Sequence, residues 1–337
     1  MQRDHLPFLP LPLRLWPLGL AALALAACAT DAAPDPHPAA QCTAAPATLR
    51  FNHVQMLGTH ASYHVAQPVP QSKLWADTHA PLPQQLQDQG VRAFELDLHY
   101  VAAQKTFIVA NRPGLDAGTT CATLGACLQQ LRTWSEAHPC HHALFVLLGN
   151  GDDIDADPVA DHLPALEAAL LQVWPRASLL TPDDVRGTGQ DLRSVVTTTG
   201  WPALAASRGQ LMVALRGSPA LSAAYKALHP QLAGAAAFLT GSVADADVAV
   251  VSDVEPAAVP DLVQKGYFVH AFPVPDPAAG AAALASGAQV VATDAPVPRS
   301  WLGGYALAWP GGSASRCNPV TALASCTAGA VNGTLAP

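Results

Sequence analysis

Residues 57–64 read LGTHASYH, and residues 90–100 read GVRAFELDLHY. The first stretch overlaps a strand-like run at residues 53–60, and the second contains one at residues 91–98. Polar groups follow, with His60 at the end of the first run and Glu95 and Asp97 near the end of the second. A histidine at the end of a strand can take a proton from an alcohol near neutral pH. His60 is therefore a candidate catalytic base.

Glu95 and Asp97 form a second candidate site. Side chains two residues apart in a strand share one face, so these carboxylates point the same way. Two carboxylates on one face repel each other unless a cation or a basic group lies between them. Their spacing suits a hard divalent cation such as calcium or magnesium, which takes oxygen ligands.

Short strand-like runs alternate with helical patterns along most of the chain. Strands are expected at residues 53–60, 91–98, 107–111, 143–150, 211–216, 247–253, 267–272 and 289–294. Helical spacing of apolar residues occurs at 82–89, 124–138, 159–173, 220–228, 259–265 and 278–285. Eight strands that alternate with helices over about 280 residues predict an α/β fold, an irregular TIM-type (β/α)8 barrel. The connection between the second and third strands is too short for a helix.

The strand-like runs finish in polar residues or are followed directly by them. These residues are His60, Glu95, Asp97, Asn111, Asn150, Asp152, Arg216, Asp253, His270 and Asp294. Strand ends are often polar simply because they reach the surface and cap the next helix. A whole set that converges on the carboxyl mouth of a barrel favours a site there, because barrel enzymes keep their chemistry at that end.

Composition excludes some classes of partner. The chain has 337 residues, of which 12% are charged, and a formal net charge of −8. A nucleic-acid partner is not expected, because such proteins need a basic footprint. A broad polybasic membrane patch is not expected either, because the net charge is negative.

The N-terminus predicts export. Basic residues precede an apolar run at 15–27, which is too short for a transmembrane helix and is typical of a signal peptide over residues 1–27. The run ends in LAAC, which resembles the bacterial lipobox and predicts lipid attachment at Cys28. An ordinary signal with a coincidental cysteine is the alternative. Residues 28–46 then form a flexible tether, and residues 47–330 form the barrel. Ala29 favours the outer membrane if the host has two.

Six cysteines remain besides Cys28, an even number that suggests disulfides in an exported protein. Local pairing of Cys121 with Cys127 and of Cys317 with Cys326 leaves Cys42 for Cys140. Fifteen pairings are possible from the sequence alone.

LGTHASYH followed by GVRAFELDLHY resembles the start of the phosphatidylinositol-specific phospholipase C superfamily, and most of all its bacterial calcium-dependent phosphoinositide phospholipase C branch. The likeness continues in order through NRPGLD, TPDDVRG, GWPALAASRGQLM and ALASGAQVVATDAP to SRCNPV, over residues 50–326. The resemblance implies a TIM-type barrel and a lipid-headgroup substrate at a membrane surface. It also implies a histidine base, a histidine acid and a metal-assisted attack of the inositol 2-hydroxyl on the phosphodiester.

The resemblance places His60 at the first catalytic histidine, and Glu95 and Asp97 at two metal ligands. Ala61 stands where the family has an asparagine ligand. Asn111 stands where the family has its second catalytic histidine, and an asparagine does not titrate.

The fourth strand departs from the family as well. Gly149 and Gly151 replace a glutamate and a lysine, and Ala295 replaces an aromatic residue that packs on the sugar. Calcium is therefore expected to bind weakly, with two of about four protein ligands present.

Other residues could complete the site. His99 shares a face with Asp97, and His270 ends the seventh run, so either could serve as the acid, although an ordinary hydrogen-bonded histidine is the simpler interpretation. Asp152 opens an acidic run that could hold a displaced metal or simply cap the next helix. Asp294 lines the mouth. His79, His141 and His142 are expected at the surface.

Two functions follow from these observations. The first is a phosphoric diester hydrolase of the phosphoinositide phospholipase C type, acting on phosphatidylinositol or a related phosphodiester lipid with impaired activity. The alternative is a catalytically inactive barrel lipoprotein that binds a ligand or serves as a scaffold. The sequence gives no expectation for the oligomeric state.

Overall fold

The computed structural model describes residues 42–72, 75–150, 159–187, 191–272, 275–309 and 312–336. The predicted signal peptide, Cys28, most of the tether and Asp152 lie outside the described residues. Within the described part of the chain, no helix has the length and apolar character needed to cross a membrane.

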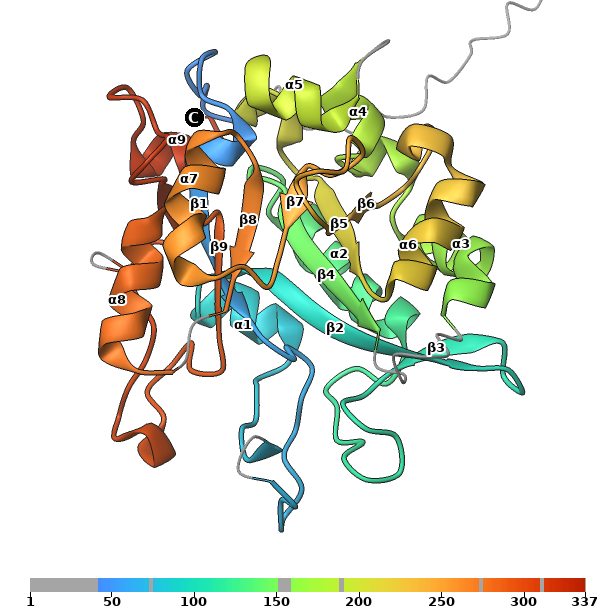
Figure 1. Cartoon of the computed structure of the whole chain (residues 1–337). Coiled ribbons are helices and arrows are strands. Elements are labelled where there is room, and N and C mark those ends of the chain that lie inside the picture. The colour runs from blue at the N-terminus through green and yellow to red at the C-terminus, as the bar shows by residue number, and fades with distance from the viewer. Residues whose placement is uncertain are drawn as a thin grey trace, which may run out of the picture. The chain divides into compact units, whose positions relative to one another are not determined.

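Eight parallel strands form the barrel (Figure 1). Around the sheet they are β6 (Phe238–Leu239), β5 (Leu211–Arg216), β4 (Leu144–Asn150), β2 (Val91–Val101), β1 (Val54–Thr59), β9 (Val290–Thr293), β8 (Phe268–Ala271) and β7 (Val250–Val251). A single parallel bridge between Thr240 and Val250 joins β6 to β7. The prediction of an irregular TIM-type barrel is confirmed.

The prediction was wrong for one of the eight barrel strands. The run at 107–111 forms β3 (Thr106–Val109), which pairs antiparallel with β2 and lies off the path of the barrel. A short connection allows only antiparallel pairing, because a parallel neighbour needs a long crossover. The two-residue strand β6 takes the eighth place in the barrel. A further short strand, β10 (Ser315–Cys317), pairs antiparallel with β1.

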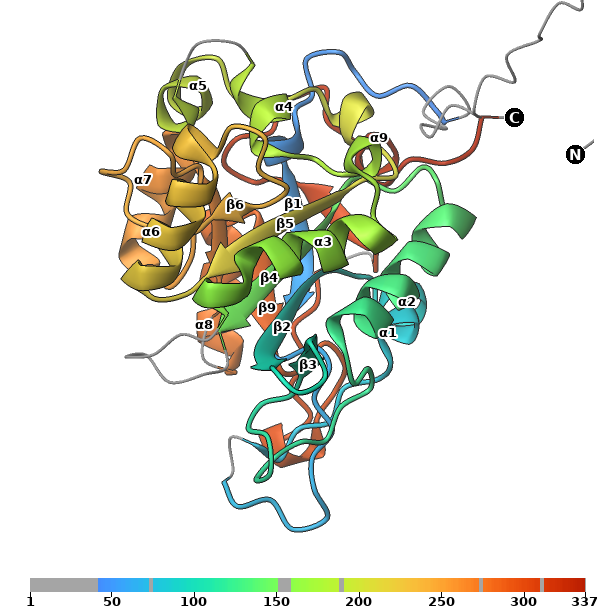
Figure 2. The ribbon, with the colours of Figure 1, turned by 90° about the vertical axis from the view of Figure 1, so that its right-hand side faces the viewer.

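Helices cover the outside of the sheet (Figure 2). Those expected from the sequence are α1 (Leu82–Asp88), α2 (Leu124–Ala137), α3 (Leu163–Val173), α6 (Pro219–Leu228), α7 (Val259–Gln264) and α8 (Pro277–Ser286). Three short helices add to them, namely α4 (Pro182–Arg186), α5 (Leu192–Thr198) and α9 (Ala328–Asn332). Side-chain caps fix several starts, such as Thr123 for α2 and Asp276 for α8, because their oxygens accept from backbone amides of the first turn.

Side chains fill the barrel interior. The rings of Phe145 on β4 and Phe268 on β8 lie 5.2 Å apart, although these strands are not neighbours in the sheet. Phe51 stacks on Phe268 at 5.4 Å. Gly58 allows close packing of β1 on β9, since a β-carbon there would lie 2.8 Å from Val290. The interior is thus a packed core that supports the polar groups at the mouth.

Three disulfides tie the fold together. Cys42 bonds to Cys140, Cys121 to Cys127, and Cys317 to Cys326. The predicted pairing is confirmed. The first bond spans 98 residues and fastens the start of the described chain to the segment before β4.

Candidate active site

His60 follows β1 directly and stands at the carboxyl end of the barrel. Its Nδ1 lies 2.9 Å from Oδ1 of Asp294, the residue that follows β9. The ring of Phe272 stacks on its imidazole at 4.3 Å. The His60 side chain is 36% exposed. One face is therefore packed and one nitrogen is oriented, while part of the ring stays open to a ligand.

The surroundings of His60 favour its charged form. Burial works to lower the pKa of the imidazole, but the hydrogen bond to Asp294 and the negative charges of Glu95, Asp294 and Asp97 raise that pKa to about 9. At neutral pH the ring is mostly an imidazolium. It must lose a proton before it can act as a base.

A basic side chain lies between the two carboxylates of β2. The Arg216 guanidinium, at the end of β5, pairs with Oε1 of the buried Glu95. Its Nη2 lies 3.9 Å from Oδ1 of Asp97, and its Nη1 lies 3.8 Å from Oδ1 of Asp253. Arg216 therefore supplies the positive charge that this carboxylate pair requires.

Gly149 on β4 makes this arrangement possible. It is paired with Asp97 on one side and with Arg216 on the other, so the three residues lie side by side across three strands. A β-carbon at Gly149 would collide with Oδ1 of Asp97 and come within 3.2 Å of Arg216 Nη2. A larger residue at this position would separate the guanidinium from the β2 carboxylates.

The residues present do not fit calcium at Glu95 and Asp97. Arg216 engages one oxygen of Glu95, and the hydroxyl of Tyr63 donates to Oδ2 of Asp97 at 2.8 Å. Ala61 offers no side-chain ligand. A calcium ion takes six to eight oxygen ligands. Burial raises the pKa of Glu95, whereas the charge of Arg216 lowers it and favours the carboxylate.

The side-chain amide of Asn111 is engaged by a carboxylate. Its Nδ2 donates to Oδ2 of Asp116 at 2.7 Å, and the same oxygen lies 2.8 Å from Nε2 of His64. Burial works to lower the pKa of His64, but Asp77 and Asp116 raise it. The His64 side chain is only 2% exposed. Asn111 and His64 line the same pocket as His60, so these hydrogen bonds order part of its wall.

The pocket at the mouth has a volume of about 170 Å³. It is lined by His60, Ala61, His64, Trp75, Asp77, Asp97 and Asn111. Ala61 has a φ of +41°, in the left-handed region that asparagine tolerates better than alanine. Four site residues predicted from the sequence, His60, Ala61, Asp97 and Asn111, therefore line a single pocket.

The two histidines considered as replacement acids lie elsewhere. His99 is buried on β2, and its Nε2 is 2.9 Å from the carbonyl oxygen of Ala110. His270 is 3% exposed and packs against Phe145 inside the barrel at 6.1 Å. Burial and the nearby charges of Arg216 and His60 lower the pKa of His270 to about 3, so it is neutral. Neither histidine lines the pocket.

Sequence reasoning did not foresee the roles of Arg216, Tyr63, Phe272 and His64. The sequence did contain a hint of the role of Arg216, because it is a basic residue at the end of one predicted strand while several other predicted strands end in acidic residues. Its pairing with Glu95 depends on cross-strand register, which a strand-by-strand inspection does not give. The expectation that His79, His141 and His142 lie at the surface was wrong, since all three are buried.

Residues 101–319 match the family described as Ca2+-dependent phosphoinositide phospholipase C. The chain belongs to this family. The matched segment includes Asn111, Arg216 and Asp294, and it begins after His60 and the β2 carboxylates.

Solved structures support the same fold. A calcium-dependent phosphoinositol-specific phospholipase C from Pseudomonas sp. is 18% identical, with a TM-score of 0.58 over 82% of this chain and 98% of that chain. A Ca2+-dependent phosphatidylinositol-specific phospholipase C from Streptomyces antibioticus is 17% identical, with a TM-score of 0.55 over 73% and 95% of the two chains. No curated protein sequence matches significantly. At these identities the solved structures show the fold alone.

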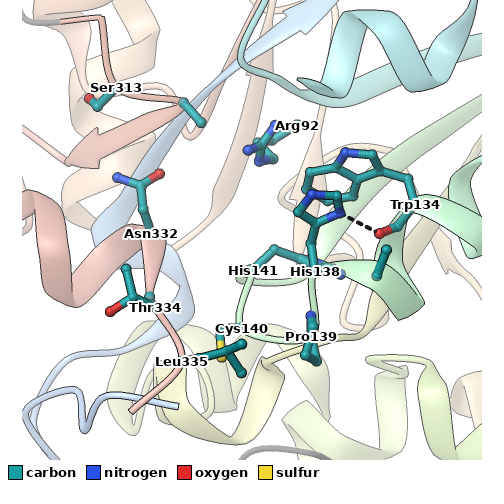
Figure 3. Close-up of a pocket in the computed structure, with 13 residues that line it drawn as sticks. Arg92, Trp134, His138, Pro139, Cys140, His141, Ser313, Asn332, Thr334 and Leu335 are labelled. Carbon is teal, nitrogen blue, oxygen red and sulfur yellow. Dashed lines mark hydrogen bonds between the residues drawn. The ribbon is translucent and has the colours of Figure 1, made fainter. Parts of the chain in front are cut away.

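A larger pocket, of about 550 Å³, opens at the other end of the barrel (Figure 3). Arg92, near the start of β2, lies over the ring of Trp134 at 4.7 Å, and His138 Nδ1 is 2.8 Å from the Trp134 carbonyl oxygen. Cys140 and His141, just before β4, also line it. No carboxylate is among the described residues of its wall. Barrel enzymes of this kind act at the opposite end, so this pocket is not the candidate active site.

Proposed function

We propose that the protein is a phosphodiesterase of the phospholipase C type that cleaves phosphatidylinositol or a related phosphodiester lipid slowly and without calcium. The observation that carries the proposal is the Arg216 guanidinium, set between Glu95 and Asp97 beside the His60–Asp294 pair. It offsets two carboxylate charges that would otherwise repel a phosphate.

The proposed reaction uses His60 as the base. Neutral His60, oriented by Asp294, takes the proton of the inositol 2-hydroxyl, and the hydroxyl oxygen attacks phosphorus. A cyclic phosphodiester forms as the bond from phosphorus to the glycerol oxygen breaks. The leaving oxygen takes a proton from water, because Asn111 has none to give. The missing general acid lowers the rate by about 10²–10⁴-fold relative to a complete site.

The raised pKa of His60 gives this proposal a distinctive pH dependence. With a pKa of about 9, roughly one ring in a hundred is neutral at pH 7. The rate is expected to rise about tenfold per pH unit until the pH approaches 9.

The test measures release of cyclic inositol phosphate from phosphatidylinositol vesicles between pH 6 and pH 10. The comparison is between the unaltered protein and His60→Asn, with His229→Gln as a matched control because His229 pairs with Glu167 on the helical shell. Product that depends on His60 and increases with pH is expected. Absence of His60-dependent product at every pH would overturn the proposal.

A second candidate function is recognition of a phosphoinositide headgroup without turnover. The bond from Asn111 to Asp116 favours it, because an amide occupies the place of a proton donor. Calorimetry with inositol 1-phosphate distinguishes the two candidates. Binding that His60→Asn weakens, together with no product, would identify a binding protein.

We also propose that the protein is exported and attached to the cell envelope through Cys28. The three disulfides of the described chain support an oxidising compartment. Metabolic labelling with a palmitate analogue tests the attachment. Label in the unaltered protein that disappears in Cys28→Ser is expected, and equal labelling of the two would contradict it.

A further inference from the structure

A second cluster of potential metal ligands consists of Asp77, His79 and Asp294. Asp77 and His79 come from the loop between β1 and α1, and Asp294 follows β9. One side-chain donor atom from each of these three residues lies within 4.8 Å of the others. The cluster shares no residue with the Glu95 and Asp97 pair.

The backbone of the loop is held in place. The amide of His79 donates to the carbonyl oxygen of His64 at 2.9 Å, and Val65 forms an antiparallel bridge with Thr78. The side chain of His79 is fully enclosed, and that of Asp77 is 7% exposed. Asp77 and His79 are fixed by the backbone and largely closed to solvent, and Asp294 is 19% exposed, so the cluster differs from the exposed acidic groups that are common on protein surfaces.

The buried ligand atoms of Asp77 and His79 lack well-formed hydrogen bonds, although the backbone of His60 acts on the His79 ring. Neither ring nitrogen of His79 makes a well-formed hydrogen bond, and neither does Oδ2 of Asp77. A buried polar group left without a partner costs about 1–3 kcal/mol. Two such groups that face each other, Asp77 Oδ2 and His79 Nε2, indicate that a bound ligand lies between them when the site is filled.

The spacing of these atoms is that of two ligands on one ion. Nε2 of His79 and Oδ2 of Asp77 lie 3.4 Å apart, beyond an ordinary hydrogen bond. Ligands held about 2.0–2.1 Å from a tetrahedral zinc ion are about 3.3 Å from each other.

Neighbouring groups orient the two carboxylates. His60 holds Oδ1 of Asp294 at 2.9 Å. His64 Nδ1 lies 3.4 Å from Oδ1 of Asp77, too far for an ordinary hydrogen bond but close enough for its charge to act on that carboxylate. Ligating carboxylates in metal sites are commonly held by such outer contacts. Arg299 donates to the backbone oxygen of Asp294 at 3.2 Å, and this hydrogen bond does not involve the Asp294 carboxylate.

We propose that Asp77, His79 and Asp294 bind a divalent transition metal of the zinc class. One imidazole and two carboxylates suit zinc, manganese or iron(II), whereas calcium prefers oxygen ligands alone. Three protein ligands leave a fourth position for water or a substrate oxygen, which is the pattern of an open zinc site. Through Asp294 this ion would lie next to His60.

The test titrates the metal-free protein with zinc alone by calorimetry and records the visible absorption of bound cobalt(II). One ion per chain is expected. His79→Gln and Asp77→Asn are each expected to weaken zinc binding by about 100-fold or more, since each removes a direct ligand. His229→Gln is the matched control and is expected to bind as the unaltered protein does.

Binding is read without any assay of turnover, so the result is separate from the proposed phosphodiesterase activity. Circular dichroism checks the fold of each variant, and Asp294→Asn replaces any variant that does not fold. No stoichiometric zinc at micromolar concentration would overturn the proposal. Equal zinc affinity in the unaltered protein and the folded ligand variants would overturn it as well.

Discussion

Replacement of Arg216 by methionine removes the positive charge between the β2 carboxylates while keeping much of the side-chain volume. Glu95 is fully buried, Arg216 is the partner of its Oε1, and its Oε2 has none. Breaking a buried ion pair by removing one partner costs about 3–5 kcal/mol. Arg216 is 28% exposed, which screens part of its charge and places the expected loss near the lower end, at about 3 kcal/mol.

The loss is expected to depend on pH with a definite sign. Burial raises the pKa of Glu95, and loss of Arg216 raises it further. In the variant the folded state then holds a proton that the unfolded state releases above its own pKa of about 4.3. The variant therefore loses stability as the pH rises through this interval, and the difference from the unaltered protein is smaller at pH 5 than at pH 8.

Urea unfolding followed by circular dichroism measures the effect. A double variant, Arg216→Met with Glu95→Gln, is expected to recover most of the loss because it leaves no buried charge unpaired. Lys265→Met serves as the control, since Lys265 pairs with Asp261 on the surface and such pairs contribute about 0.3–0.5 kcal/mol. A loss below about 1 kcal/mol in Arg216→Met, or one independent of pH, would refute the idea that this guanidinium neutralises Glu95.

Three further predictions concern the scaffold. Replacing both Cys42 and Cys140 by serine is expected to lower the free energy of unfolding by about 3–4 kcal/mol. The reason is that this disulfide joins residues 98 positions apart and so restricts the unfolded chain. An unchanged urea midpoint would contradict this prediction. Burial lowers the pKa of His141 to about 3 and that of His142 well below 6.5. The stability that their neutral forms contribute is therefore fully present above pH 6.5, and it falls by about 1.4 kcal/mol per pH unit for each histidine as the pH drops below that value. A urea midpoint that stays constant between pH 7 and pH 5 would exclude this. Ala61→Gly is expected to raise stability by about 0.5–1 kcal/mol in thermal unfolding, since Ala61 has a φ of +41°; a lower melting temperature would show that its methyl group matters more.

Much of the barrel was predictable because its longer strands are rich in apolar residues. β4 and β5 contain the continuous apolar runs LFVLL and LMVAL, whereas β1 and β2 interleave apolar and polar residues. Six helices show clear three- and four-residue spacing. β6 was not predictable, because two residues carry no periodicity. The run that became β3 had the composition of a barrel strand, and only its short connection to β2 distinguished it.

The candidate site was predictable in position but not in chemistry. His60, Glu95 and Asp97 were found because strand alternation decides which face a side chain takes. The pairing of Arg216 with Glu95 was not, because it depends on the alignment of three strands through Gly149. The burial of His79 depends on how a loop folds back over the mouth, which local sequence does not encode.

The central claim is that Arg216 replaces the calcium of the family in this chain. The most direct measurement is the initial rate of cyclic inositol phosphate release from phosphatidylinositol vesicles at pH 9, with EGTA and then with millimolar calcium. The same His60-dependent rate under both conditions is the predicted result. A rate that appears only with calcium would contradict the claim, because it would show that the ion displaces the guanidinium from Glu95 and Asp97.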